Sequence, residues 1–170
     1  YRPFVIDDEE REFDLQIDTI FGGTAPGLPT DLAADGGRIA LAVSDEEGNG
    51  RIALLDAASA KLLRTVQAPS PTGVGLREID GELRLYAILD GRIHRIDPQN
   101  GETSRLRTPG LGNPAAIALD ADGNVVVADT GPDSRVKAYS ADGELAYTCG
   151  KKGGRPIRGE FEPQAMVRMS

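Results

Sequence analysis

Apolar residues in this chain recur in short alternating runs, and none of these runs keeps a helical period over three turns. The segment RIALLD at 51–56 recurs as RIHRID at 92–97 and as RVKAYS at 135–140, at spacings of 41 and 43 residues. In each copy an inward Ile or Val alternates with polar or small neighbours, which is the two-residue period of a half-buried strand. The spacing indicates a structural repeat of about 42 residues.

Each copy is accompanied by three more strand-like segments, so the repeating unit is predicted to have four strands. The first strands are expected at 28–35, 72–80 and 113–120, the second at 38–44, 82–89 and 124–130, and the fourth at 61–68, 103–109 and 144–150. Turn sequences join the second strand to the third: DEEGNG at 45–50, DG at 90–91 and DTGPDS at 129–134. Asp and Gly suit such hairpins because Gly accepts positive φ and Asp bonds nearby backbone. The strands are therefore expected to be antiparallel.

Four short strands repeated at this period are typical of a β-propeller blade. The fold class predicted is all-β, with three full blades at approximately 28–68, 72–109 and 113–150. Residues 13–22 resemble the close of a preceding blade and 160–170 the approach to a following one, while 1–12 form an acidic linker or partial strand. Six blades would need roughly 250 residues, so we expect a piece of a larger propeller whose two ends do not pair into a fourth blade.

Composition narrows the class of protein further. Of the 170 residues, 39% are hydrophobic and 27% charged, and no apolar run approaches the ~20 residues of a membrane-spanning helix. The net charge of −8 argues against nucleic acid as a partner. One cysteine and one histidine, Cys149 and His94, exclude an internal disulfide and zinc sites built on several histidines, and no cofactor is predicted.

The third repeat, NPAAIALDADGNVVVADTGPDSRVKAYSADGELAYTCGKKGG at 113–154, resembles an NHL repeat. The likeness lies in its Pro-led first strand, its D-G-N turn, its apolar strand ending in Ala-Asp-Thr and its Arg-Val strand. It extends in weaker form over roughly 13–170. The resemblance implies a propeller in which the connections between blades lie on the side where many propellers display ligand sites.

An aspartate near the end of the second strand and an arginine at the start of the third recur in all three repeats. The pairs are Asp45 with Arg51, Asp90 with Arg92, and Asp129 with Arg135. We expect each pair to lie across one hairpin turn and to pin its loop. The alternative is a binding rim, in which Asp129 and Arg135 would bind a ligand instead of each other.

The segment KKGGRPIR at 151–158 places four cations within eight residues of an acidic chain. Gly and Pro predict a loop, and backbone N–H groups with arginine can hold a carboxylate, sulfate or phosphate. Lys151, Lys152, Arg155 and Arg158 are the candidate anion-binding residues. The alternative is an ordinary solvated loop.

Other chemistry-bearing residues have simpler interpretations. The run DADGN at 120–124 has its glycine in the wrong place for a helix-loop-helix calcium site and is expected to form a hairpin turn. His94 is expected to be an ordinary strand residue, since no nucleophile-elbow sequence lies near it. Cys149 is expected to be a small buried hydrophobe.

These features favour a noncatalytic propeller that acts as a binding or interaction scaffold within a larger, bacterial and exported protein. Its partners would be a protein or a carbohydrate-type ligand, together with further blades or domains of the same parent chain. The alternative is a propeller enzyme, a lyase or hydrolase, whose catalytic residues lie mostly outside this segment. A third reading, a protein or RNA hub, would use the cations of the 151–158 loop.

Overall fold

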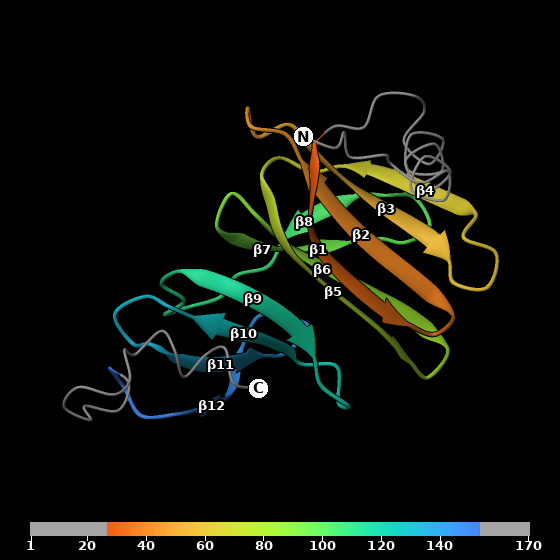
Figure 1. Ribbon diagram of the computed structural model, residues 1–170. Helices are drawn as coiled ribbons and strands as arrows, with labels where there is room; N and C mark the ends of the chain where they lie inside the picture. The colour runs from red at the N-terminus through yellow and green to blue at the C-terminus, as the bar shows by residue number, and fades with distance from the viewer. Residues whose placement is uncertain (1–26, 154–170) are drawn as a thin grey trace, which may run out of the picture.

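The computed structural model describes residues 27–153, which form three four-stranded antiparallel sheets (Figure 1). Each sheet contains four strands that are consecutive in the chain, and we call the sheets blades 1, 2 and 3. Blade 1 contains β1 (Leu28–Asp35), β2 (Arg38–Ser44), β3 (Gly50–Asp56) and β4 (Leu62–Gln67); blade 2 contains β5 (Pro71–Ile79), β6 (Glu82–Leu89), β7 (Arg92–Ile96) and β8 (Thr103–Arg105); blade 3 contains β9 (Pro114–Leu119), β10 (Val125–Asp129), β11 (Arg135–Tyr139) and β12 (Leu145–Cys149). No helix that could cross a membrane occurs within the described range.

Tight turns make the hairpins possible. The two-residue turns Asp80-Gly81 and Asp90-Gly91 have positive φ at both positions, 53° and 78° in the first and 47° and 67° in the second. This is the backbone of the turn type that matches the twist of antiparallel strands. Asp tolerates this conformation better than most residues, and Gly adopts it freely. The turn residues therefore define the pairing register of their strands.

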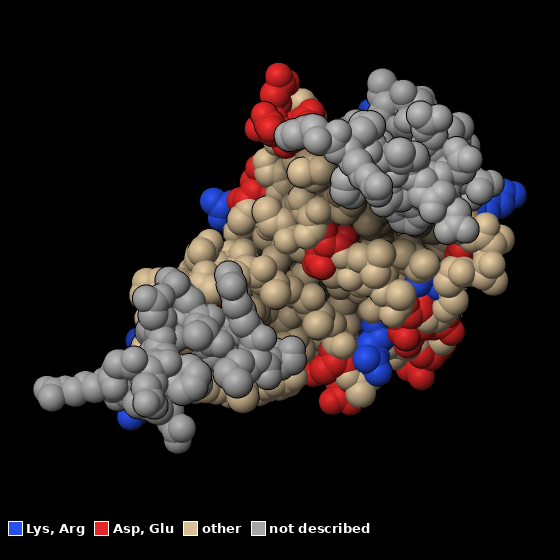
Figure 2. Space-filling view, in the orientation of Figure 1, with Lys and Arg blue, Asp and Glu red and all other residues tan. Residues whose placement is uncertain are grey.

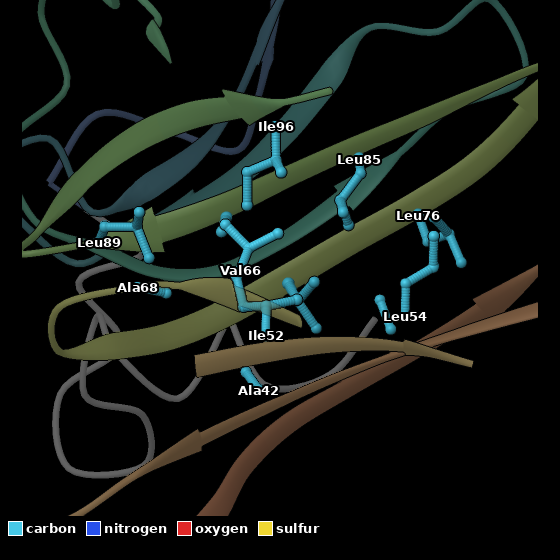
Figure 3. Packing of buried hydrophobic residues seen from close by; sticks show 12 residues of the cluster. Ala42, Ile52, Leu54, Val66, Ala68, Leu76, Leu85, Leu89 and Ile96 are labelled. Carbon is cyan, nitrogen blue, oxygen red and sulfur yellow. The ribbon is translucent and has the colours of Figure 1, made fainter. Parts of the chain in front are cut away.

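The blades stack face to face around their first strands, because β5 packs against β1 on one side and β9 on the other. Between blades 1 and 2 lies a core of aliphatic side chains, shown in Figure 3, that includes Ile52, Leu54, Leu76 and Leu85. A second core, between blades 2 and 3, contains Tyr86, Ile93, Val127 and Tyr139 among others. Burying one such side chain contributes about 1.5–3 kcal/mol, so the blades stabilise one another.

Carboxylates of β1 also bind the backbone of β5. Asp31 Oδ2 accepts a hydrogen bond of 2.9 Å from the Val74 N–H, and Asp35 Oδ2 accepts one of 2.8 Å from the Glu78 N–H. Donor and carboxylate are 43 residues apart in both bonds, one repeat. These two bonds fix how blade 2 sits along blade 1.

The predicted fold class is confirmed: the structure is all-β and its blades are four-stranded and antiparallel. The segment expected as a strand at 103–109 is shorter, since β8 ends at Arg105. Leu106 still donates a backbone hydrogen bond to Ile93 of β7, and its side chain is buried before the chain leaves for blade 3. The segments expected as partial blades, 13–22 and 160–170, lie outside the described residues, as does the 1–12 linker.

Charges on the surface are separated by broad uncharged areas, as Figure 2 shows for one side of the molecule. Acidic atoms gather where the β2–β3 loop projects in Figure 1, and this loop carries Asp45, Glu46 and Glu47. The loops at this end of each blade therefore differ in charge, although the strands beneath them repeat.

Replacing Asp31 with Ala is expected to lower the free energy of unfolding by about 1–2 kcal/mol, because the buried Val74 N–H loses its acceptor. Asp31→Asn keeps an acceptor oxygen and is the matched control, with a smaller loss expected. Urea unfolding and hydrogen exchange at Val74 measure the two effects. Equal stability of Asp31→Ala and the parent chain would contradict the role given to this bond.

Candidate functional site

A buried ion pair lies at the loop end of blade 3. Asp129, the last residue of β10, and Lys137, in the middle of β11, are 0% and 2% exposed. Their Oδ2 and Nζ atoms are 2.6 Å apart. These are the two buried charged or polar residues among those the structure describes. A buried ion pair is stable only when its remaining hydrogen-bonding groups are also satisfied.

Backbone N–H groups satisfy the Asp129 carboxylate. Its Oδ1 accepts from the N–H groups of Asn113 (2.8 Å) and Gly131 (2.9 Å), and its Oδ2 accepts from that of Gly112 (3.1 Å). Burial alone would raise the pKa of Asp129, but these bonds and the one from Lys137 outweigh it and lower the pKa from 3.8 to about 2. The carboxylate is therefore ionised and fully engaged.

Lys137 uses all three of its N–H donors. Nζ donates to Asp129, to the carbonyl of Gly110, and to Asp133 Oδ2 at 3.0 Å. Burial would lower the pKa of Lys137, but the hydrogen bonds to the two carboxylates hold that pKa above its ordinary value. Because Gly110 belongs to the connection between blades 2 and 3, the ammonium joins that connection to the β10–β11 loop.

Asp133 extends this network to the surface. Its carboxylate lies 3.5 Å from Arg135 Nη2 and 3.4 Å from Lys152 Nζ, and its carbonyl accepts a 2.7 Å bond from the Gly153 N–H. Lys152, from the predicted anion loop, is thus placed beside a carboxylate, and its side chain is exposed. Lys151 is exposed as well, whereas Arg155 and Arg158 lie outside the described residues.

The predicted pairing of Asp129 with Arg135 differs from the observed one. The two residues lie opposite each other in the β10–β11 ladder, as expected. The carboxylate nevertheless binds Lys137, and the arginine pairs with Asp133. Asp129 is directed into the space beneath the connection from blade 2, where the lysine on the same face of the sheet reaches it.

In blade 1, Asp45 organises its own loop. Its carboxylate accepts bonds from the Glu47 N–H, the Asn49 N–H and the Asn49 side-chain amide. The hydrogen bond from the Asn49 side chain is the main reason that the pKa of Asp45 lies below its usual value. Asp45 lies outside the β2–β3 ladder, whose last pair is Ser44 with Gly50. Arg51 lies opposite Val43 in the pair before it.

In blade 2, Asp90 occupies the first position of the two-residue turn, and Arg92 lies opposite Leu89 in the ladder. Within the described part of the chain, no ion pair joins Asp90 to Arg92. Asp129, in contrast, occupies the strand position of Leu89, so the three aspartates are not structurally equivalent.

The remaining candidate residues have structural surroundings. Asp120 accepts hydrogen bonds from the backbone N–H groups of Asp122 and Asn124 and from the Asn124 side-chain amide, which order the expected hairpin turn. It also accepts one from the Tyr147 hydroxyl of β12. Cys149 was expected to be buried but is exposed, because β12 is the outer strand of its blade.

His94 is partly buried on β7, opposite Arg105 of β8. Its pKa is lowered by burial and by the positive charge of Arg105, and its Nδ1 atom is buried with no hydrogen-bond partner in the described structure.

The sequence interpretation missed Lys137 and Asp133. The available signal was the third position of the RIALLD, RIHRID and RVKAYS segments, which is occupied by Ala53, His94 and Lys137. Strand alternation puts this position on the face opposite the inward Ile or Val. A lysine there needs a counter-charge because the stacked blades bury that face as well. Which carboxylate supplies that charge depends on how the β10–β11 loop folds.

Comparisons with known proteins agree with the fold. No family model matches the chain, and no curated protein does. Similar solved structures are a gluconolactonase from Xanthomonas campestris (18% identity, TM-score 0.57, covering 74% of this chain and 48% of that one), hydrazine synthase from Kuenenia stuttgartiensis (18%, 0.56, 72% and 35%) and a chain of a nidogen–laminin complex (17%, 0.54, 75% and 51%). The protein is thus built of β-propeller blades and spans about half, or less, of the length of these neighbours.

Asp129→Asn is expected to lower the free energy of unfolding by about 3 kcal/mol, because the amide leaves a buried lysine with one counter-charge fewer and directs a donor at other donors. The matched control is Asp133→Asn, which changes the more exposed carboxylate bound to the same lysine. We expect that variant to lose about 1 kcal/mol or less. Equal losses, or a fully stable Asp129→Asn, would contradict the structural role of Asp129.

The ionisation of Asp129 should also make the free energy of unfolding depend on pH in the acid range. Its pKa is lower in the folded chain than in the unfolded one, so its stabilisation is complete above about pH 4 and is lost as the pH falls toward 2. The difference corresponds to about 2 kcal/mol for Asp129 alone. Denaturant unfolding measured between pH 5 and 2 should show a shallower dependence on pH in Asp129→Asn. Parallel curves would refute this contribution.

Proposed function

We propose that the chain is part of an NHL-type propeller that serves as a noncatalytic binding scaffold in a larger protein. The observation that carries this proposal is the complete use of the buried charges of blade 3 in holding loops. Asp129 and Lys137 bind each other, the blade connection and the β10–β11 loop through their hydrogen bonds. Groups held in this way act as a framework for the surface above them.

The NHL assignment is supported by the hydrogen bonds that the Ala-Asp-Thr-Gly motif at 128–131 makes in the fold. Asp129 binds the N–H of Gly131, while Thr130 and Asn113 bond each other through both backbone and side chains. The motif therefore joins the second strand of blade 3 to the connection that enters it. Such a joint suits a repeat in which these motif residues hold the blade together and the exposed loops are left to bind partners.

The binding surface proposed is the loop from Lys151 to Arg158, with an anionic group on a protein or a carbohydrate-type ligand as its partner. Lys152 supports this proposal because its ammonium lies beside Asp133 of the β10–β11 loop while its side chain stays exposed. An exported bacterial parent protein with further blades remains part of the same proposal.

The alternative is a propeller enzyme whose catalytic groups come from other blades. The likeness to a gluconolactonase concerns the fold alone, and function differs widely among proteins that share a fold. A hydrolysis assay with δ-gluconolactone is therefore a direct test. We expect the chain to hydrolyse it no faster than buffer does, and a clear acceleration would overturn the noncatalytic proposal.

Binding is tested with two immobilised probes, a polyglutamate peptide and polygalacturonate. Lys151→Glu with Lys152→Glu should weaken binding to at least one probe by about tenfold, since each lysine interacts through its charge. The control is Lys61→Glu with Arg95→Glu, which also reverses two exposed cations and also breaks one surface ion pair. Unchanged affinity in the first variant, or equal losses in both, would overturn the assignment of the loop.

A further inference from the structure

A groove of about 480 Å³ lies on the loop side of blade 2, where the chain leaves this blade for blade 3. Its walls are the β6–β7 turn at Gly91, the ends of β7 and β8, and the connection that follows β8. Three arginines line it: Arg92, Arg105 and Arg107. The volume falls in the range of small-molecule sites.

The charge of this groove is unusual for the protein. Among residues 27–153, no carboxylate lines it, although the whole chain has a net charge of −8. Within residues 27–153, none of its three arginines forms an ion pair, whereas Arg38, Arg95 and Arg135 each pair with a carboxylate. All three groove arginines are exposed, so their guanidinium groups are available to a ligand.

The surroundings of His94 are consistent with this positive charge. The histidine lies opposite Arg105 and two residues from Arg92, and among the residues that the structure describes Asp90 is the negative group that acts on it. After burial, the charge of Arg105 is the main cause that lowers the pKa of His94. Its Nδ1 atom is buried and without a partner in the described structure. At His94 the charge of Arg105 therefore outweighs that of Asp90.

One wall of the groove is held rigidly. The connection that carries Pro109, Gly110 and Gly112 is bound by blade 3 at each of these residues: the Tyr139 hydroxyl donates to the Pro109 carbonyl (3.2 Å), Lys137 to the Gly110 carbonyl, and the Gly112 N–H to Asp129. The buried ion pair thus preorganises this side of the groove. A preorganised site binds at a lower entropic cost.

We propose that this groove is a binding site for a phosphate-type dianion, either free or carried by a small ligand such as a sugar phosphate. One planar guanidinium satisfies a carboxylate through two parallel hydrogen bonds, whereas a tetrahedral dianion accepts from several guanidinium groups at once. Three unpaired arginines around one groove match the second ligand. The site is separate from the 151–158 loop, since none of the described loop residues lines it.

The test is isothermal titration calorimetry of the full chain at low ionic strength with inorganic phosphate, glucose 6-phosphate and acetate. Phosphate or glucose 6-phosphate should bind more tightly than acetate, and the tighter of the two identifies the free or the carried form. Combining Arg92→Gln, Arg105→Gln and Arg107→Gln should weaken that binding by about tenfold or more. Because these side chains are exposed, we expect this variant to stay folded, which circular dichroism checks.

Two further measurements keep this test separate from that of the scaffold proposal. The Lys151→Glu and Lys152→Glu variant should retain its affinity for phosphate. His94 is the single histidine, so its NMR titration can be followed directly, and its pKa should rise when a dianion offsets the arginine charges. Absence of phosphate binding, loss of binding in the lysine variant but not in the arginine variant, or an unmoved His94 pKa would each overturn the groove assignment.

Discussion

The need of each sheet to bury two apolar faces governs this structure. A four-stranded sheet in this chain presents aliphatic residues on both sides, and a single blade has nothing of its own to cover them. Both faces of blade 2 are covered by its neighbours. Leu76 and Leu85 pack toward blade 1, and Tyr86 and Ile93 pack toward blade 3. Close approach at the innermost strands requires small residues. A side chain at Gly75 would stand 2.8 Å from Leu119 Cδ1 of the neighbouring blade.

Polar groups then determine how the stacked blades are aligned. Asp31 and Asp35 bind the backbone of β5, and Asp129 binds the backbone that enters β9. In the first two cases the carboxylate accepts from a strand of the neighbouring blade, and in the third from the connection between two blades. Apolar packing alone does not fix such alignments, because it is not directional. This is also why the ends of the blades are well-defined surfaces. The arginine groove owes the position of one wall to the Asp129–Lys137 pair, so the buried charges and the exposed ones belong to a single arrangement.

The turns and strands were predicted correctly, because they depend on residues that are neighbours in the sequence. The Asp90-Gly91 hairpin follows from the φ angles that these two residues tolerate, and the RIALLD-type repeats follow from strand alternation. The partner of Asp129 was not predictable in this way. The ladder register does place Arg135 opposite Asp129, but the Asp129 carboxylate faces the blade connection, where it binds Lys137 and two backbone N–H groups. Cys149 was misjudged because hydrophobic character does not reveal which strand forms the outer edge.

The strands, their turns and their grouping into blades can be derived from the sequence, since these depend on residues within about 42 positions of one another. Which charges are paired, buried or exposed depends on how the blades stack. Lys137 and Gly110 are 27 residues apart, and Asp31 and Val74 are 43 apart, so their contacts exist only after the blades have stacked. The same holds for Arg92, Arg105 and Arg107. Their spacing in the chain looks ordinary, and they line one groove because the connection after β8 folds back across the end of blade 2.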